Sequence, residues 1–237
     1  MTSQGEVIAL LAREASVDVV LLGLSATVAP ILPVENLIAT QPIEPTGTEA
    51  VTACRSFLDM YNTANGYRDN SKSLTSTNIS GACSGRTKPR YLTTPKTYPS
   101  VSYDWDGFGT VSSWNSYMTQ GKQAGNIAMT ATAGNCGKGV DCSGFVSRVW
   151  GLSSHIYTNA LDNYSTTVSG GLHAMWPFDI FLKQGQHVIF FSGWDDYEIN
   201  FTVYESTTTN SWDRVVFHWV DAAYVNGYEM RRYNNRC

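Results

Sequence analysis

The chain has 237 residues, of which 43% are hydrophobic and only 15% are charged, and its formal net charge is −4 at pH 7. This is enough apolar material for one large core or two small ones, which excludes a disordered chain. The 16 basic residues are scattered along an acidic chain, so we expect no basic surface that could bind nucleic acid.

Residues 1–45 are predicted to be a leader-like segment followed by a linker. Residues 17–32 are largely apolar, as in the hydrophobic part of a signal peptide, although acidic residues precede them and Gly and Pro interrupt them. An export signal, a misassigned start and a surface helix are all open interpretations. The stretch is too short and too interrupted for a membrane span. The low charge and the many aromatic residues favour a secreted or cell-surface protein.

The folded domain is predicted to cover residues 46–237 and to begin with helical elements. Apolar residues recur every three or four positions in residues 48–62, which predicts an amphipathic helix. Residues 62–100 are polar and contain several prolines, so we expect a long loop or a pair of irregular ribbons. Two further helices are predicted at about 111–123 and 141–150.

Beyond residue 177 the pattern becomes that of strands. Short runs rich in β-branched and aromatic residues are separated by clusters of turn-forming residues, and they lie at 180–182, 187–191, 201–204 and 215–219. Helices followed by strands predict an α+β domain with an antiparallel sheet.

Cys142 is the strongest candidate for a nucleophile. Asp141 is a suitable N-cap, which places Cys142 in the first turn of a helix, where unpaired N–H groups favour a thiolate. Ser143 and Gly144 are small and would leave room for a substrate backbone, while the N–H of Cys142 could bind a developing oxyanion. The alternative interpretation is a buried, inert cysteine in a helix.

Residues 139–146, G-V-D-C-S-G-F-V, resemble the nucleophile motif of the NlpC/P60 family of papain-like cysteine peptidases. Upstream, residues 103–107 (Y-D-W-D-G) look like the family's Y-x-W-G-G segment. Downstream, residues 185–188 (G-Q-H-V) look like its His-Val strand, and residues 203–206 (V-Y-E-S) occupy the place of the strand that supplies a third polar residue. The resemblance implies a papain-like fold in which the catalytic helix packs on an antiparallel β-sheet.

The resemblance also implies a function, namely cleavage of amide bonds in cell-wall peptides such as peptidoglycan stems. Cys142 would form an acyl-enzyme, His187 would transfer the proton, and Glu205 would orient His187. Such a peptidase or amidase needs no metal and no organic cofactor. Residues expected to contact the substrate or the oxyanion are Tyr103, Asp141 and Ser143.

The sequence departs from the family pattern in three places. Asp106 replaces the first glycine expected after the tryptophan, and Phe178 stands where a glycine precedes Asp179. The family's counterpart of Asp179 is mainly structural, and we expect the same here. An insertion at about 108–138 separates the tyrosine segment from Cys142, and we expect it to form a lid or a wall beside the cleft.

The five cysteines lack the paired spacing of a zinc site, and their odd number leaves at least one free thiol. With Cys142 as that thiol, the other four can form two disulfides. The sequence does not fix the connectivity, but the pairing that we expect is Cys54 with Cys83 and Cys136 with Cys237.

Two other functions also fit the sequence. A cell-wall or glycan-binding module could keep the fold without turnover, and an acyltransferase could use the same thioester chemistry with an amine or lipid acceptor. The remaining histidines, which are His155, His173 and His218, are expected to be structural or to face solvent.

Overall fold

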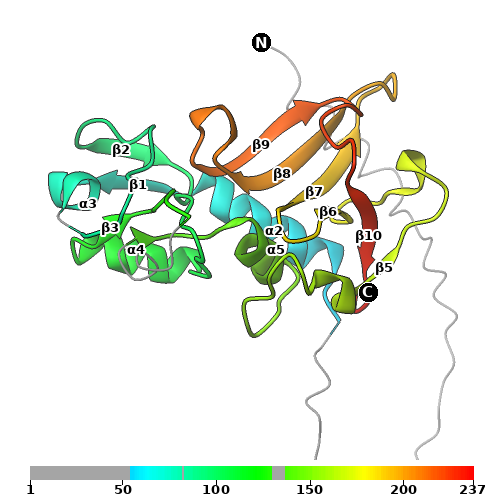
Figure 1. Cartoon of the computed structure of the whole chain (residues 1–237), viewed down its shortest axis with the longest axis horizontal. Coiled ribbons are helices and arrows are strands. Elements are labelled where there is room, and N and C mark those ends of the chain that lie inside the picture. Colours follow the sequence, from blue (N-terminus) through cyan, green and yellow to red (C-terminus); the bar gives the residue numbers. More distant parts are fainter. Residues whose placement is uncertain (1–53, 82, 130–136) are drawn as a thin grey trace, which may run out of the picture. The chain divides into compact units, whose positions relative to one another are not determined.

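The computed structural model describes residues 54–81, 83–129 and 137–237 (Figure 1). Its α-helices are α2 (Phe57–Asp69), α3 (Ser76–Ser80), α4 (Val111–Thr119) and α5 (Cys142–Val149). Its strands are β1 (Ser71–Leu74), β2 (Lys96–Pro99), β3 (Gln123–Ala124), β4 (Gly137–Lys138), β5 (Ser165–Thr167), β6 (Ile180–Lys183), β7 (His187–Trp194), β8 (Phe201–Thr207), β9 (Arg214–Val220) and β10 (Glu229–Tyr233). None of the described helices has the length and apolar character that crossing a membrane requires.

A six-stranded sheet forms the centre of the described domain, with the order β5-β10-β6-β7-β8-β9. All its neighbouring strands pair antiparallel. The prediction of an α+β domain with an antiparallel sheet is therefore confirmed. The four predicted strand runs correspond to β6, β7, β8 and β9, whereas β5 and β10 were not predicted from the sequence.

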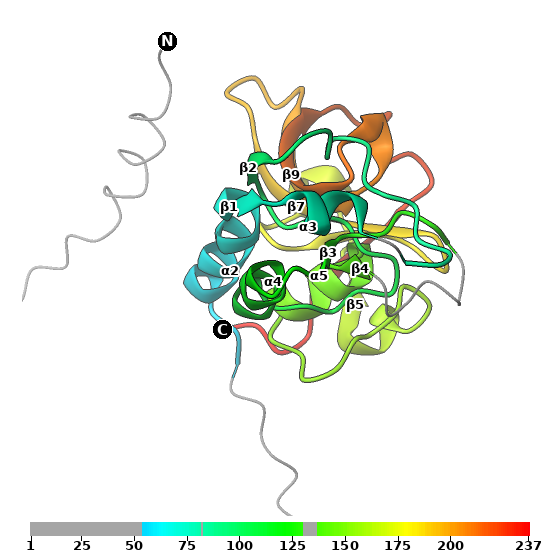
Figure 2. The same ribbon diagram turned by 90° about the vertical axis from the view of Figure 1, so that its left-hand side faces the viewer.

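The two faces of this sheet bury different sets of side chains, as the alternation along a strand requires. On one face, Phe190 of β7 and Tyr204 of β8 belong to the larger core, which also includes the apolar side of α5. On the other face, Phe191 and Val203 belong to a second apolar cluster. Helices α2 and α5 contact the sheet through β7, β8 and β9, and they lie beside it in both views (Figures 1 and 2).

The first helix differs from its prediction at both ends. Residues 48–53 lie outside the described residues, and α2 begins only at Phe57, because Ser56 is the N-cap and its side chain accepts a hydrogen bond from the Asp59 N–H. The helix then continues to Asp69, through residues whose polarity had suggested a loop. Buried side chains on one face, among them Tyr67, hold this extension against the core.

The polar region up to residue 100 and the insertion together form a small group of elements. Strands β1 and β2 pair antiparallel, so part of the predicted loop is ordered as a ribbon. Helix α4, inside the insertion, contacts β1 and β3, and it ends earlier than predicted because Gly121 adopts a positive φ of 73°. The expectation that the insertion forms a lid or a wall stays a prediction, and residues 130–136 lie outside the described part.

The disulfide pairing differs from the expectation. Cys54 is bonded to Cys237, with their Cα atoms 5.4 Å apart, so both expected pairs are wrong. Cys83 is also disulfide-bonded, and Cys136 lies outside the described residues. Cys142 is a free thiol, as predicted, and its side chain is buried. The expected pairing failed because contacts far apart in the sequence are set by the tertiary fold and leave no local pattern.

Candidate active site

Cys142 is the first residue of α5, and the cap before it fixes its position. The Asp141 carboxylate accepts a hydrogen bond of 2.6 Å from the Gly144 N–H, and the Asp141 N–H donates to the Gly107 carbonyl at 3.0 Å. The thiol is therefore held where the first N–H groups of a helix lack intrahelical partners. This is the environment that the sequence predicted for a reactive cysteine.

The space beside Gly144 is not open to a substrate backbone, contrary to the sequence-based expectation. A Cβ atom added at Gly144 would lie 2.1 Å from the carbonyl oxygen of Gly107. The absence of a side chain thus serves internal packing, because it lets the segment around Gly107 approach α5 closely.

The Gly144→Ala variant is expected to lower the free energy of unfolding by about 1–3 kcal/mol, because the backbone at Gly107 must shift to accept a methyl group. Urea denaturation measures the loss. Gly66→Ala is the matched control, since Gly66 lies in α2 with nothing within 4 Å of its added Cβ, and alanine there should stabilise the helix by about 0.5–1 kcal/mol. Equal effects of the two substitutions would contradict the packing argument.

His187 is the first residue of β7 and connects Cys142 with Glu205. Its Nε2 lies 2.7 Å from Oε2 of Glu205, which leaves Nδ1 for the thiol of Cys142, its other side-chain hydrogen-bond partner. Burial lowers the pKa of His187, but the charges and hydrogen bonds of Cys142 and Glu205 outweigh this effect and raise the pKa to about 10. The structure thus brings together the three side chains that were predicted to be catalytic.

Glu205 lies in the middle of β8 and is fully buried. Besides His187, its carboxylate contacts Nε2 of His218 at 2.7 Å and accepts a hydrogen bond of 2.6 Å from the Tyr224 hydroxyl, both on Oε1. Burial raises the pKa of Glu205, but these three partners and the charge of His187 lower it to about 2. The carboxylate is therefore an acceptor for all three partners.

These shifts predict how the network contributes to stability at different pH values. The pKa of Glu205 is lowered from 4.5, so its contribution is present above about pH 4.5 and is lost as the pH falls toward 2. The pKa of His187 is raised from 6.5, so its contribution is present below about pH 6.5 and is lost as the pH rises toward 10. Both contributions are present together between about pH 4.5 and pH 6.5, so the difference in melting temperature between the native chain and Glu205→Gln should be largest in that range. An equal difference at pH 3, 5.5 and 9 would contradict this expectation.

Tyr103 lies near the thiol, as expected. Its backbone pairs with Val140, directly before the cap of α5, and its ring is buried. Burial and the nearby charges of Cys142, Asp141 and Asp104 raise the pKa of the Tyr103 phenol. The phenol therefore stays protonated and keeps a hydrogen-bond donor close to Cys142.

Ser143 and Asp141 are joined by His155, one of the histidines expected to be structural or to face solvent. The Ser143 hydroxyl donates to Asp141 at 3.0 Å, and Nε2 of His155 lies 2.8 Å from the Ser143 hydroxyl and 3.1 Å from the Asp141 carboxylate. The His155 ring also stacks on Phe108. His155 therefore supports the cap of α5, and it does not stand alone in a loop.

Asp179, which was expected to be structural, forms its hydrogen bonds with residues outside the candidate active site. Its buried carboxylate accepts hydrogen bonds from the guanidinium of Arg232, with a shortest distance of 2.6 Å, and from the Trp176 N–H at 2.8 Å. The third residue on His187 is Glu205, so this geometry agrees with a structural role for Asp179.

Sequence reasoning missed two partners of Glu205, His218 and Tyr224. The strand register could have indicated the first, because His218 is paired with Val203, on the same face of the sheet as Glu205. Nothing local in the sequence indicates Tyr224, which follows β9 in a turn. Of the three histidines expected to be structural or solvent-facing, only His173, stacked on Trp194 at the surface, lies outside these networks.

The described residues contain no group of three His, Cys, Asp or Glu side chains placed to hold a metal ion. Comparisons with protein-family models, with curated proteins and with solved structures found no match for this chain. The functional interpretation therefore depends on the geometry around Cys142 and on the motif resemblance.

Proposed function

We propose that the protein is a cysteine hydrolase that cleaves amide bonds in cell-wall peptides. The observation that carries this proposal is a buried free thiol, Cys142, at the start of α5 and hydrogen-bonded to His187, which in turn contacts the buried carboxylate of Glu205. Thiol, imidazole and carboxylate in this order form the arrangement of a nucleophile, a base and a group that orients the base.

In the proposed mechanism, Cys142 gives its proton to Nδ1 of His187 and its sulfur attacks the substrate carbonyl. The carbonyl oxygen becomes an oxyanion, which the N–H groups at the start of α5 can stabilise, with the Tyr103 phenol as a further donor. His187 then protonates the leaving amine as the C–N bond breaks, which leaves a thioester on Cys142. His187 then deprotonates a water molecule, which attacks the thioester carbonyl. The C–S bond breaks, the carboxylic acid product leaves, and His187 returns the proton to the sulfur of Cys142.

The substrate class comes from the resemblance of residues 139–146 and 185–188 to the NlpC/P60 family, whose members cut peptide bonds of the cell wall. The disulfide between Cys54 and Cys237 supports an oxidising, extracytoplasmic location, where such substrates are found. Asp141 and Ser143 lie beside the nucleophile, and we assign them, together with Tyr103, to the inner lining of the substrate site.

The test is incubation of the full chain, and of its Cys142→Ala variant, with a mixture of peptidoglycan fragments, followed by mass spectrometry. New peptide fragments should form with the native chain, and the variant should form them at least about 10³-fold more slowly, because no other group replaces the nucleophile. The mass of each product identifies the bond that was cut.

Two other outcomes of the same experiment would contradict the hydrolase proposal and favour a different function. Products that carry an added amine or lipid group would indicate an acyltransferase. If neither form changes the fragments but both bind insoluble cell wall, the protein is a binding module.

A further inference from the structure

Two of the three partners of Glu205 lie outside the proposed Cys-His-Glu triad. Nε2 of His218 lies 2.7 Å from Oε1 of the carboxylate, and the Tyr224 hydroxyl donates to the same oxygen at 2.6 Å. His187 contacts the other oxygen, Oε2. Both oxygens of a carboxylate without solvent exposure are thus occupied, which is the condition for burying such a charge.

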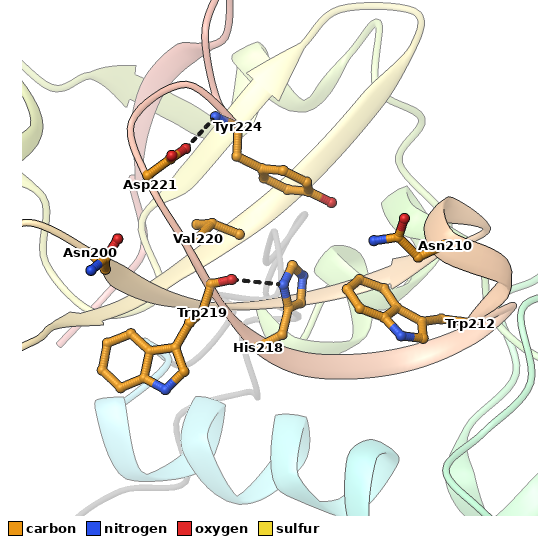
Figure 3. Close-up of a pocket in the computed structure, with 8 residues that line it drawn as sticks. All are labelled: Asn200, Asn210, Trp212, His218, Trp219, Val220, Asp221 and Tyr224. Carbon is orange, nitrogen blue, oxygen red and sulfur yellow. Dashed lines mark hydrogen bonds between the residues drawn. The ribbon is translucent and has the colours of Figure 1, made fainter.

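The surroundings of His218 and Tyr224 hold them in place. The His218 ring packs on the indole of Trp212, with 4.4 Å between ring centroids, and lies edge-on to the ring of Tyr224 at 5.5 Å. In Figure 3 the His218 ring lies between those of Tyr224 and Trp212, and Trp219 lies on the side away from Trp212. All four residues line a pocket of about 350 Å³. Neither Glu205 partner is a freely rotating surface side chain.

The direction of the hydrogen bond between Glu205 and His187 decides which ring nitrogen of His187 carries the proton. While Glu205 is ionised it accepts the proton on Nε2 of His187, so that Nδ1 can take the proton of the Cys142 thiol. A protonated Glu205 could instead donate to Nε2. The neutral ring would then carry its proton on Nδ1, toward Cys142, and could no longer act as the base.

We propose that His218 and Tyr224 are positioning residues that keep Glu205 ionised and in one orientation, so that His187 presents a free Nδ1 to Cys142. The inference rests on the proposed function, because it assigns these residues to the same thiol chemistry. It predicts that losing either donor narrows the pH range in which the thiolate forms.

The titratable side chains around Glu205 come from four elements of the fold. They are His187 on β7, His218 on β9, and Tyr224 and Tyr228 in the segment between β9 and β10, with Cys142 of α5 beyond His187. Burial and the charges of Glu205 and Cys142 raise the pKa of Tyr228 to about 12, so this group stays neutral in the acid range of the experiment.

The experiment measures the rate at which iodoacetamide alkylates Cys142 between pH 3 and pH 9, read at the level of the Cys142 peptide by mass spectrometry. It uses the full chain and the variants His218→Leu, His218→Gln and Tyr224→Phe. No substrate is needed, because the thiolate itself reacts.

For His218→Leu and Tyr224→Phe, we expect the acid limb of the rate profile to move up by about one pH unit, so that the rate is about tenfold lower at a given pH on that limb, because each variant removes one hydrogen bond to a charged group. His218→Gln offers an amide donor at a similar reach, so its rate should stay within about threefold of the native rate. Tyr224→Phe keeps the ring and removes only the hydroxyl, which makes it the variant least able to disturb folding.

Unchanged acid limbs in both His218→Leu and Tyr224→Phe, with a reactive native thiol, would overturn the inference and leave the proposed function standing. Failure of His218→Gln to restore the rate would also overturn it, since lost packing would then explain the leucine variant. If the acid limb of native Cys142 coincides with that of the same cysteine in the urea-denatured chain, the thiolate pair is absent, and the proposed function fails together with this inference.

Discussion

Glu205→Gln is expected to lower the rate of amide cleavage by about 10²- to 10⁴-fold, through the wrong tautomer of His187. His218 and Tyr224 both contact Oε1, so the amide oxygen of glutamine best takes that place. The amide NH₂ group then occupies the place of Oε2 and donates to Nε2 of His187. This fixes the ring proton on Nδ1, facing Cys142, and removes the acceptor for the thiol proton.

The control for this variant is Asp179→Asn. Asp179 is also a buried carboxylate and pairs with Arg232, but it contacts none of the three proposed catalytic side chains in the described hydrogen-bond network. Its substitution should lower stability without slowing cleavage per folded molecule. Steady-state rates corrected for the folded fraction test both claims. Equal losses in the two variants, or an unaffected Glu205→Gln, would contradict the assignment of Glu205.

The second large effect is expected for stability. The bond between Cys54 and Cys237 closes a loop with a sequence separation of 183, for which chain entropy predicts a stabilisation of about 5 kcal/mol. The stability change measured on removing a disulfide is commonly smaller than this value, so the free energy of unfolding of the double variant Cys54→Ser and Cys237→Ser should fall by about 3–5 kcal/mol. For a domain of this size this lowers the melting temperature by roughly 10 °C.

Calorimetry under oxidising conditions measures this change in melting temperature. Cys142→Ser is the matched control, because Cys142 forms no disulfide. A double variant that melts within 2 °C of the native chain would show that the bond adds little. The double variant also isolates this disulfide from Cys83, which a reductant would affect at the same time.

The parts of the site that could be predicted are those with a local cause. Asp is a preferred N-cap residue, so Asp141 followed by the apolar spacing of Phe145, Val146 and Val149 predicts a helix that starts at Cys142. Likewise, the apolar run after His187 indicates a strand beginning at that residue. Glu205 was harder to place, because β8 is buried along its whole length and shows no alternation of polar and apolar residues.

The parts that could not be predicted depend on contacts between distant segments. Strand β10 has the sequence E-M-R-R-Y, which has no apolar period, and it is ordered because it fits between β5 and β6. The sequence around His218 indicates only a strand. Its contact with Glu205 depends on the register between β8 and β9, which the sequence does not reveal. The disulfide partners are decided in the same way, by which segments the finished sheet brings together.

The same disulfide determines how the domain responds to mechanical force. Backbone hydrogen bonds also join the segments around Cys54 and Cys237: the Arg55 N–H donates to the Asn235 carbonyl, and the Cys237 N–H donates to the Arg55 carbonyl. The first and last described residues of the domain therefore lie next to each other. A pull applied between residues 54 and 237 is carried by the covalent bond, and the sheet bears none of it. With this bond and the disulfide of Cys83 both reduced, the intervening chain could extend to roughly 600 Å. Oxidation therefore makes the domain inextensible between these two residues, and reduction would expose the candidate active site to unfolding under tension.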